Sequence, residues 1–186
     1  IGGVVGYNNG VANNLRLWKA QPSQDNLPTN ISFNDYLAQI NELCHGLYPD
    51  DTTEHGKILR LRQQYFFVSA GLQSAIRGYL RTGGDLHKFY EHYVFQLNDT
   101  HPILAIPELM RILMDEHGFG WDEAWEQATK CIAYTNHTIM PEALEKWPIQ
   151  YVQNLIPRCF MIIEEINRRS LIWMHQNNVS ESEMYN

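Results

Sequence analysis

The longest regular pattern of apolar and polar positions runs from Lys57 to Leu80. Its apolar residues recur every three or four positions, as on one face of an α-helix, and Gly83 and Gly84 predict the end of the helix. The apolar stripe consists of Leu61, Tyr65, Val68, Leu72, Ala75, Ile76 and Tyr79.

Shorter segments predict further helices. Ser32 or Asn34 can cap the first of them through a side-chain oxygen, Gly118 favours the end of another, and Pro157 precedes the last. The expected ranges are about 33–44, 103–116, 122–130, 141–144 and 158–173.

Two short apolar runs, Tyr93–Leu97 and Cys131–Thr135, have the composition of buried strands, and residues 4–17 are typical of a strand or hairpin edge. Because helices follow strands repeatedly, the expected fold class is α/β with much added helix. We expect residues 1–173 to form one domain or a large part of one, and the polar residues 174–186 to be frayed or disordered.

Composition narrows the class of protein. A hydrophobic content of 44% and a charged content of 19% are typical of a soluble globular chain, and no apolar run is long enough to span a membrane. The net charge of −7 disfavours binding to nucleic acid or anionic membranes. Three widely separated cysteines fit neither a disulfide framework nor a zinc site, which favours a reducing cytoplasm. The opening Ile1–Gly6, without an initiator Met, indicates an internal piece of a larger protein.

Polar residues crowd directly after both apolar runs, at Asn98–Pro102 and at Asn136–Thr138. If the two strands are parallel neighbours, Asp99, His101 and His137 converge with Asn136 and Thr138 at one sheet edge. Such groups can hydrogen-bond sugar hydroxyls, and an Asp can orient a His by holding one ring nitrogen.

A structural role competes with this interpretation. Asp99 or Thr100 could cap the helix that opens near Pro102, and for either polar segment alone capping is slightly favoured. The two segments together favour function. The acidic loop Tyr48–Glu54 fits a gate over a polar cleft and a solvated turn equally well. No nucleotide-binding glycine motif, zinc-protease motif or serine-hydrolase motif occurs, and the histidines lack metal-ligand spacing.

Several runs, in order along nearly all of residues 1–173, resemble the signature of the α-glucan (glycogen, starch or maltodextrin) phosphorylase family. The most distinctive are QLNDTHP at 96–102, AIPELMR at 105–111, AYTNHT at 133–138 and PEALEKWP at 141–148. Further matches are NLRLW at 14–18, LYPDD at 47–51, LRL at 59–61 and QYF at 64–66.

The resemblance implies a dimeric, two-domain glycosyltransferase of the GT-B type that uses pyridoxal phosphate. Such an enzyme splits α-1,4-glucans with inorganic phosphate and releases glucose 1-phosphate. This chain would be a helix-rich part of the N-terminal domain with a few mostly parallel strands. The lysine that binds the cofactor would lie in the C-terminal domain, so the chain alone is expected to be inactive.

The resemblance also assigns roles to residues. His137 would hydrogen-bond the hydroxymethyl group of the transferred glucose, and Asp99 would support His137. Asp51 would lie in the loop that gates the cleft. His101, Arg60 and Tyr48 would line the acceptor-glucan side. The remaining substrate-binding candidates are Asn136, Thr138 and Glu142.

Two departures from the family pattern qualify these roles. Thr52 and Thr53 stand where many animal enzymes have an Asn and an aromatic residue, which disfavours direct contact between the gating loop and glucose. Arg77 is followed by Gly78 instead of a second arginine, which argues against phosphate-effector control at that place.

Two other functions stay open at this point. One is a glucan-binding or assembly module without catalysis. The other is a hydrolase with a carboxylate pair drawn from Asp99, Glu142 and Asp51.

Overall fold

The computed structural model describes residues 2–4, 6–23, 25, 27–140 and 144–179. The chain divides into two compact units, Ile1–Gln63 and Gln64–Asn186, and the division falls inside the long helix α2 (Glu54–Arg81). The helix expected over 57–80 is therefore confirmed, with three more residues at its start and one at its end.

The first unit opens with a hairpin. Strands β1 (Gly2–Val4) and β2 (Ala12–Asn14) pair antiparallel, with Gly2 opposite Asn14. The left-handed backbone of Gly6 and Gly10, with φ of 81° and 71°, suits the reversal between them. The expected hairpin is confirmed, with shorter strands than the 4–17 segment suggested.

Helix α1 (Phe33–His45) follows in the same unit. The Ser32 hydroxyl accepts a hydrogen bond from the Asp35 backbone N–H at 3.1 Å, so Ser32 and not Asn34 is the cap. No residue of α1 is buried.

The start of α2 is fixed by a threonine and a glycine. The Thr53 hydroxyl accepts a hydrogen bond from the Gly56 backbone N–H at 3.0 Å, which satisfies one of the unpaired N–H groups of the first turn. Gly56 is buried, and a Cβ placed there would lie 1.8 Å from the carbonyl oxygen of Asp50. The first turn of α2 thus packs directly on the loop that holds the acidic residues.

We expect Gly56→Ala to lower the melting temperature, because the added methyl group would push the Asp50 backbone away at a cost of about 1–3 kcal/mol. Gly71→Ala is the matched control, since Gly71 lies in the same helix with no atom within 4 Å of the added Cβ. That control should stabilise the helix by about 0.5–1 kcal/mol. Equal melting temperatures for the two variants would contradict the close packing at Gly56.

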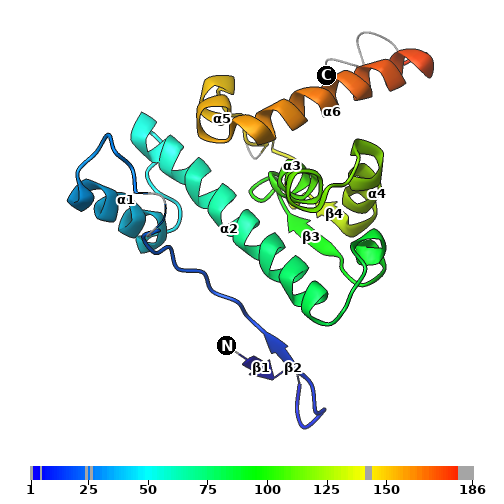
Figure 1. Ribbon diagram of the computed structural model, residues 1–186, viewed down its shortest axis with the longest axis horizontal. Coiled ribbons are helices and arrows are strands. Elements are labelled where there is room, and N and C mark those ends of the chain that lie inside the picture. Colours follow the sequence, from blue (N-terminus) through cyan, green and yellow to red (C-terminus); the bar gives the residue numbers. More distant parts are fainter. Residues whose placement is uncertain (1, 5, 24, 26, 141–143, 180–186) are drawn as a thin grey trace. The chain divides into compact units, whose positions relative to one another are not determined.

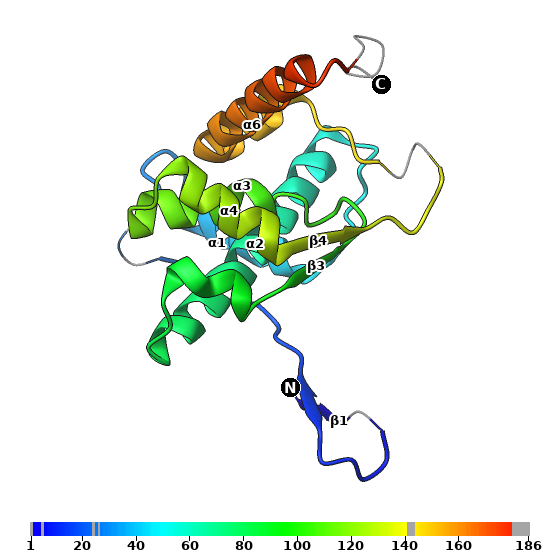
Figure 2. The same cartoon turned by 90° about the vertical axis from the view of Figure 1, so that its right-hand side faces the viewer.

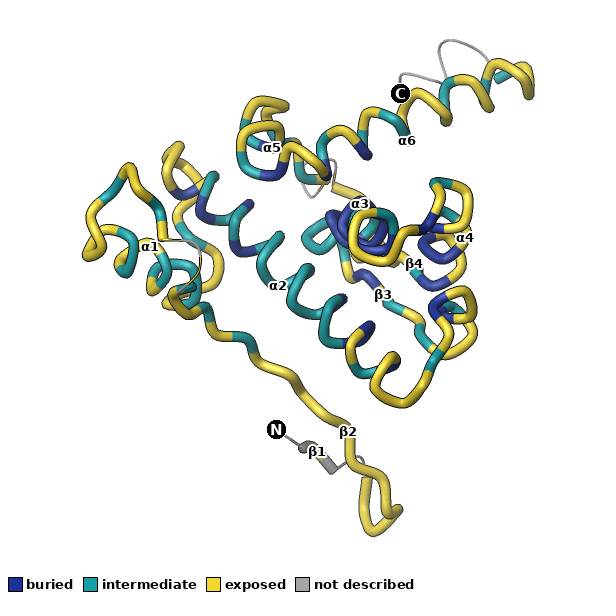
Figure 3. Tube along the Cα trace, in the orientation of Figure 1, coloured by how far each residue is buried: buried dark blue, intermediate teal, exposed yellow. Residues whose placement is uncertain are grey.

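The core lies in the second unit, around helix α3 (Ala105–Arg111). Figure 3 shows α3 almost wholly buried. It packs against α4 (Trp121–Cys131) and α6 (Pro157–Gln176). The fully enclosed apolar side chains of this core include Phe89, Leu109, Met110, Ile112, Leu113, Cys131 and Ile162.

A parallel strand pair carries the candidate site of this unit. Strands β3 (Phe95–Asn98) and β4 (Ile132–Thr135) lie side by side, with Asn98 opposite Thr135 (Figures 1 and 2). The chain crosses from one to the other through α3, the π-helix η2 (Ile112–Glu116) and α4. The expected α/β class is confirmed.

The expectation that both strands are buried is wrong. In β3 only Leu97 is buried, and in β4 no residue is, with Tyr134 45% exposed. Side chains alternate between the faces of a sheet, and of this pair only the face with Leu97 reaches the core.

The sequence pattern did not predict every helix correctly. The 3₁₀ helix η1 (Leu86–Glu91) and α5 (Ile149–Leu155) were not expected, because each is too short to show a helical period. Leu144 lies in a bend and not in a helix, and the rest of the helix expected at 141–144 lies outside the described residues. Helix α6 includes Pro157 and reaches Gln176, beyond the expected end at Trp173.

Candidate functional site

The carboxyl ends of β3 and β4 bring the two polar segments together. The Asp99 backbone N–H donates to the Thr135 carbonyl at 2.9 Å, which continues the strand pairing by one residue. The Asp99 Oδ1 then accepts a hydrogen bond from the His137 backbone N–H at 3.0 Å. The predicted meeting of these segments at one edge of a parallel pair is confirmed.

Asp99 and Tyr48 share an uncommon backbone conformation. Each has a φ of 58°, in the left-handed region that residues other than glycine seldom adopt. The other described non-glycine residues with positive φ are Asn8 and Asn178, of the type that tolerates this region best. Asp is enriched in this region as Asn is, so of the two candidate site residues only Tyr48 needs its surroundings to hold this conformation.

The ring of His137 is held by a residue that the sequence did not suggest. Its Nε2 lies 3.3 Å from the Asn98 Oδ1, whereas Asp99 contacts the His137 backbone N–H. Asp99 therefore supports His137 through the main chain and not through a ring nitrogen. The His137 side chain is exposed, so its ring can reach a bound molecule.

His101 lies between two carboxylates. Its Nε2 is 3.8 Å from the Asp99 Oδ2, and its Nδ1 is 3.2 Å from the Glu145 Oε2. Glu145 was not predicted as a site residue. The only signal for it was its place in the phosphorylase-like run at 141–148.

The capping role considered for Asp99 and Thr100 does not occur. Helix α3 begins after Leu104 without a side-chain cap, and the Thr100 hydroxyl instead donates to the Glu145 Oε2 at 3.3 Å. The side chains of Asn136 and Thr138, in contrast, each stabilise a turn by accepting a hydrogen bond from a backbone N–H two residues further along the chain. The Asn136 Oδ1 accepts from the Thr138 backbone N–H at 3.3 Å, and the Thr138 hydroxyl accepts from the Met140 N–H at 3.1 Å.

The first unit holds a second group of candidates. Arg60 Nη1 donates to the Asp51 Oδ2 at 3.1 Å, and its guanidinium lies 5.6 Å from the centre of the Tyr48 ring. Tyr48 is 72% exposed and lines an open surface pocket of about 900 Å³, together with Trp18, Leu47 and Pro49. This group presents an aromatic face and a cation side by side.

Local hydrogen bonds explain the two threonines that depart from the family pattern. The Asp50 Oδ1 accepts from the Thr52 hydroxyl at 2.7 Å and from the Thr52 backbone N–H at 3.1 Å. These bonds hold the pKa of the Asp50 carboxyl below its ordinary value. With Thr53 capping α2, both threonines shape the loop that carries Asp51.

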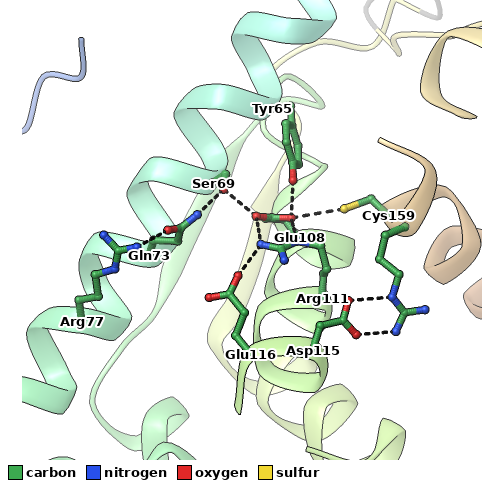
Figure 4. Close-up of polar contacts among 10 residues, drawn as sticks. Tyr65, Ser69, Gln73, Arg77, Glu108, Arg111, Asp115, Glu116 and Cys159 are labelled. Atoms are coloured by element: carbon green, nitrogen blue, oxygen red, sulfur yellow. Dashed lines mark hydrogen bonds and ion pairs between the residues drawn. The ribbon is translucent and has the colours of Figure 1, made fainter. Parts of the chain in front are cut away.

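A buried polar network in the second unit was also missed by sequence reasoning (Figure 4). Glu108 is fully buried in α3, where its carboxylate accepts hydrogen bonds from four side chains. The donors, with distances to the carboxylate oxygens, are Tyr65 at 2.9 Å, Ser69 at 2.6 Å, Arg111 at 2.7 and 2.9 Å, and Cys159 at 3.4 Å. One carboxylate thus joins α2, α3 and α6.

This network shifts the ionisation of its members. Burial acts to raise the pKa of Glu108, but the hydrogen bonds from Arg111 and Ser69 outweigh it and the pKa is lowered. Burial raises the pKa of Tyr65 and, to about 12, that of the Cys159 thiol. Glu108 is therefore an ionised structural anchor, and Cys159 is a protonated, unreactive thiol.

Other kinds of site find no support in the part of the chain that the structure covers. There, no three His, Cys, Asp or Glu side chains gather closely enough to hold a metal ion. Nor does any helix in these ranges have both the length and the apolar character needed to cross a bilayer. Around Asp99, imidazole, amide and hydroxyl groups offer hydrogen bonds suited to a hydroxyl-rich ligand.

Comparison with known proteins decides the family. A family model described as carbohydrate phosphorylase matches residues 2–186. The chain belongs to this family. The phosphorylase chain is 49% identical over 166 residues to a glycogen phosphorylase of Bacillus subtilis, and 50% identical over 163 residues to glycogen phosphorylase 2 of Dictyostelium discoideum. It is 47% identical over 179 residues to the H isozyme of α-glucan phosphorylase from Solanum tuberosum.

These relatives are much longer than the phosphorylase chain. The matches cover 89%, 84% and 89% of this chain but only 21%, 16% and 21% of the respective relatives. The chain thus spans about a fifth of their length.

The structure places most of the predicted site residues of this phosphorylase chain. His101 and His137 meet around Asp99 in the second unit, with Asn136 and Thr138 in the adjoining turn. Tyr48, Asp51 and Arg60 form the separate group in the first unit. Glu142 lies outside the described residues.

Proposed function

We propose that this chain is part of the N-terminal, GT-B-type domain of an α-1,4-glucan phosphorylase, an enzyme that releases glucose 1-phosphate from glucan and inorganic phosphate. The family match along residues 2–186 and the relatives named for glycogen and α-glucan support this proposal. By this assignment the chain supplies residues that bind the transferred glucose and the acceptor glucan.

The observation that carries the proposal is the meeting of Asp99, His101 and His137 beyond the ends of β3 and β4. In open α/β sheets, ligands bind outside the carboxyl ends of parallel strands. The exposed His137 ring, on a backbone that Asp99 holds at 3.0 Å, is suited to hydrogen-bond a glucose hydroxymethyl group. His101 would serve the acceptor side, with Arg60 and Tyr48 in the same role.

The residues of this chain do not fit the cofactor. Pyridoxal phosphate needs a lysine for its Schiff base and a cradle of donors for its phosphate. All five lysines of the chain lie in the described ranges and are exposed, and Lys130 is in an ion pair with Glu126. We therefore place the cofactor in the C-terminal domain of the longer enzyme, and expect this chain alone to be inactive.

Partners and location follow from the same assignment. The C-terminal domain would be the first partner, a second copy of the enzyme would complete a homodimer, and α-1,4-glucan and inorganic phosphate would be the substrates. The three cysteines are free thiols, which supports a cytoplasmic enzyme.

Product analysis of the full-length protein tests this function. The proposal predicts glucose 1-phosphate, formed from maltoheptaose only when inorganic phosphate is present. Release of reducing sugar without phosphate would instead indicate a hydrolase. Glucan binding without any turnover would indicate a binding module.

We expect Asp99→Asn to lower the turnover of the full-length enzyme strongly while leaving its melting temperature nearly unchanged. Asn tolerates the left-handed backbone and keeps an acceptor for the His137 N–H, but it removes the negative charge beside His101. Asp99→Ala, which also loses the acceptor, should cost a further ~1 kcal/mol in stability. Steady-state kinetics check the first expectation, and wild-type kinetics for Asp99→Asn would refute it.

A further inference from the structure

Glu145 makes more contacts to the candidate site than its place in the chain suggests. It lies between β4 and α5 without belonging to either, and its side chain is 13% exposed. Gln64 Nε2, on α2, donates to the Glu145 Oε1 at 2.9 Å. The Thr100 hydroxyl donates to the Glu145 Oε2 at 3.3 Å and accepts from the Glu145 backbone N–H at 3.3 Å. The carboxylate is thus fixed from α2 and from the loop that follows β3.

The fixed carboxylate faces one nitrogen of the His101 ring. The distance from the Glu145 Oε2 to the buried His101 Nδ1 is 3.2 Å, which is an ion-pair distance, but the geometry of this contact is not that of a hydrogen bond. On the other side, the distance from Nε2 to the Asp99 Oδ2 is 3.8 Å, which is too long for a direct hydrogen bond. The nearer of the two carboxylates is therefore that of Glu145.

A carboxylate at one ring nitrogen holds a proton there and so sets the tautomer of a neutral histidine. Glu145 would then determine whether the opposite nitrogen, Nε2, is a hydrogen-bond donor or an acceptor.

We infer that Glu145 is a positioning residue for His101: its charge beside Nδ1 favours a proton on that nitrogen and thereby sets how Nε2 meets the acceptor glucan. The inference rests on the proposed function. Glu145 acts through His101 and needs no contact with the substrate for this role. Gln64 and Thr100 keep the carboxylate in place.

A double-mutant cycle in the full-length enzyme tests this inference. Glu145→Gln keeps the size of the side chain but removes the charge that holds the ring proton. Loss of a carboxylate that supports a metal-bound histidine costs about 10–100-fold, and we expect kcat/KM for maltoheptaose to fall by a factor of that order. The KM for phosphate should stay near the wild-type value, because His101 serves the glucan side.

The decisive measurement is Glu145→Gln in a His101→Asn background, where the further loss in kcat/KM should be less than about twofold if Glu145 acts through His101. Glu126→Gln, the same change on an exposed glutamate of α4, is the matched control and should leave kinetics unchanged. Gln64→Met should lower kcat/KM several-fold through the same histidine, and it replaces Glu145→Gln in the cycle if that variant does not fold.

The possible outcomes distinguish a failure of the positioning role of Glu145 from a failure of the proposed phosphorylase function. Losses that multiply in the double variant, in an enzyme whose wild type makes glucose 1-phosphate, overturn the positioning role alone. Absence of glucose 1-phosphate from the wild type overturns the proposed function and the role of Glu145 together. A small further loss on the His101→Asn background supports both.

Discussion

His137→Ala is expected to lower the turnover of the full-length enzyme by on the order of 100–1,000-fold, the usual cost of one preorganised hydrogen-bond donor to a transition state. The loss in stability should be small. The ring is exposed, its Nε2 lies 3.3 Å from the Asn98 Oδ1, and the backbone bond to Asp99 survives the substitution. We expect the melting temperature to change by less than about 2 °C.

Turnover per folded molecule and the melting temperature, measured on the same sample, check this result. His117→Ala is the matched control, because His117 is also exposed but follows η2, away from the ends of β3 and β4 in sequence. It should leave both quantities unchanged. A large fall in melting temperature with normal turnover for His137→Ala would show a structural role instead.

Glu108→Ala is expected to cost about 3–5 kcal/mol of local stability, the range for removing one partner of a buried ion pair. The substitution would leave the Tyr65 and Ser69 hydroxyls without their acceptor and would remove the buried one of the two carboxylates that Arg111 contacts. Hydrogen exchange of the amides of α3 measures this free energy directly.

Glu116→Ala is the control for Glu108→Ala, because Glu116 pairs with the same arginine from an exposed position. The distance from Arg111 Nη2 to the Glu116 Oε1 is 2.9 Å, and the Glu116 side chain is 43% exposed. An exposed pair contributes about 0–1 kcal/mol, so the control should change little. Equal losses for the two variants would contradict the central place of Glu108 in the network.

The lowered pKa of Glu108 adds a pH dependence. Since the folded-state pKa lies below the ordinary value of 4.5, the stabilisation is fully present above that pH. It is lost as the pH falls through the lower, folded-state pKa. Wild-type α3 should therefore lose protection in acid more steeply than α3 of Glu108→Ala. Parallel pH profiles would mean that Glu108 does not carry this dependence.

Regular patterns predicted much of the fold. The apolar stripe from Leu61 to Tyr79 predicted α2 to within a few residues, because a long amphipathic helix repeats its signal many times. Two short apolar runs that each end in polar residues predicted β3 and β4, and the parallel pairing that the structure shows was only a condition of the predicted meeting of those polar residues. The helix η1 and the π-turn of η2 could not be foreseen, since they depend on packing and not on a local period.

The candidate site was predictable in part. The resemblance to phosphorylases pointed to Asp99 and His137, and parallel pairing explains why they meet. The buried Glu108 looked like one polar position in an apolar helix, since its partners Tyr65 and Cys159 are 43 and 51 residues away in sequence. Glu145 was missed for the same reason, because its partner Gln64 is 81 residues away.

The most direct test of the central claim is a phosphorolysis assay with maltoheptaose, inorganic phosphate and added pyridoxal phosphate, run on this chain and on the full-length protein. We predict glucose 1-phosphate from the full-length protein and none from the chain alone. Glucose 1-phosphate from the chain alone would contradict a cofactor site in a separate domain. No product from a folded full-length protein would contradict the assignment as a glucan phosphorylase.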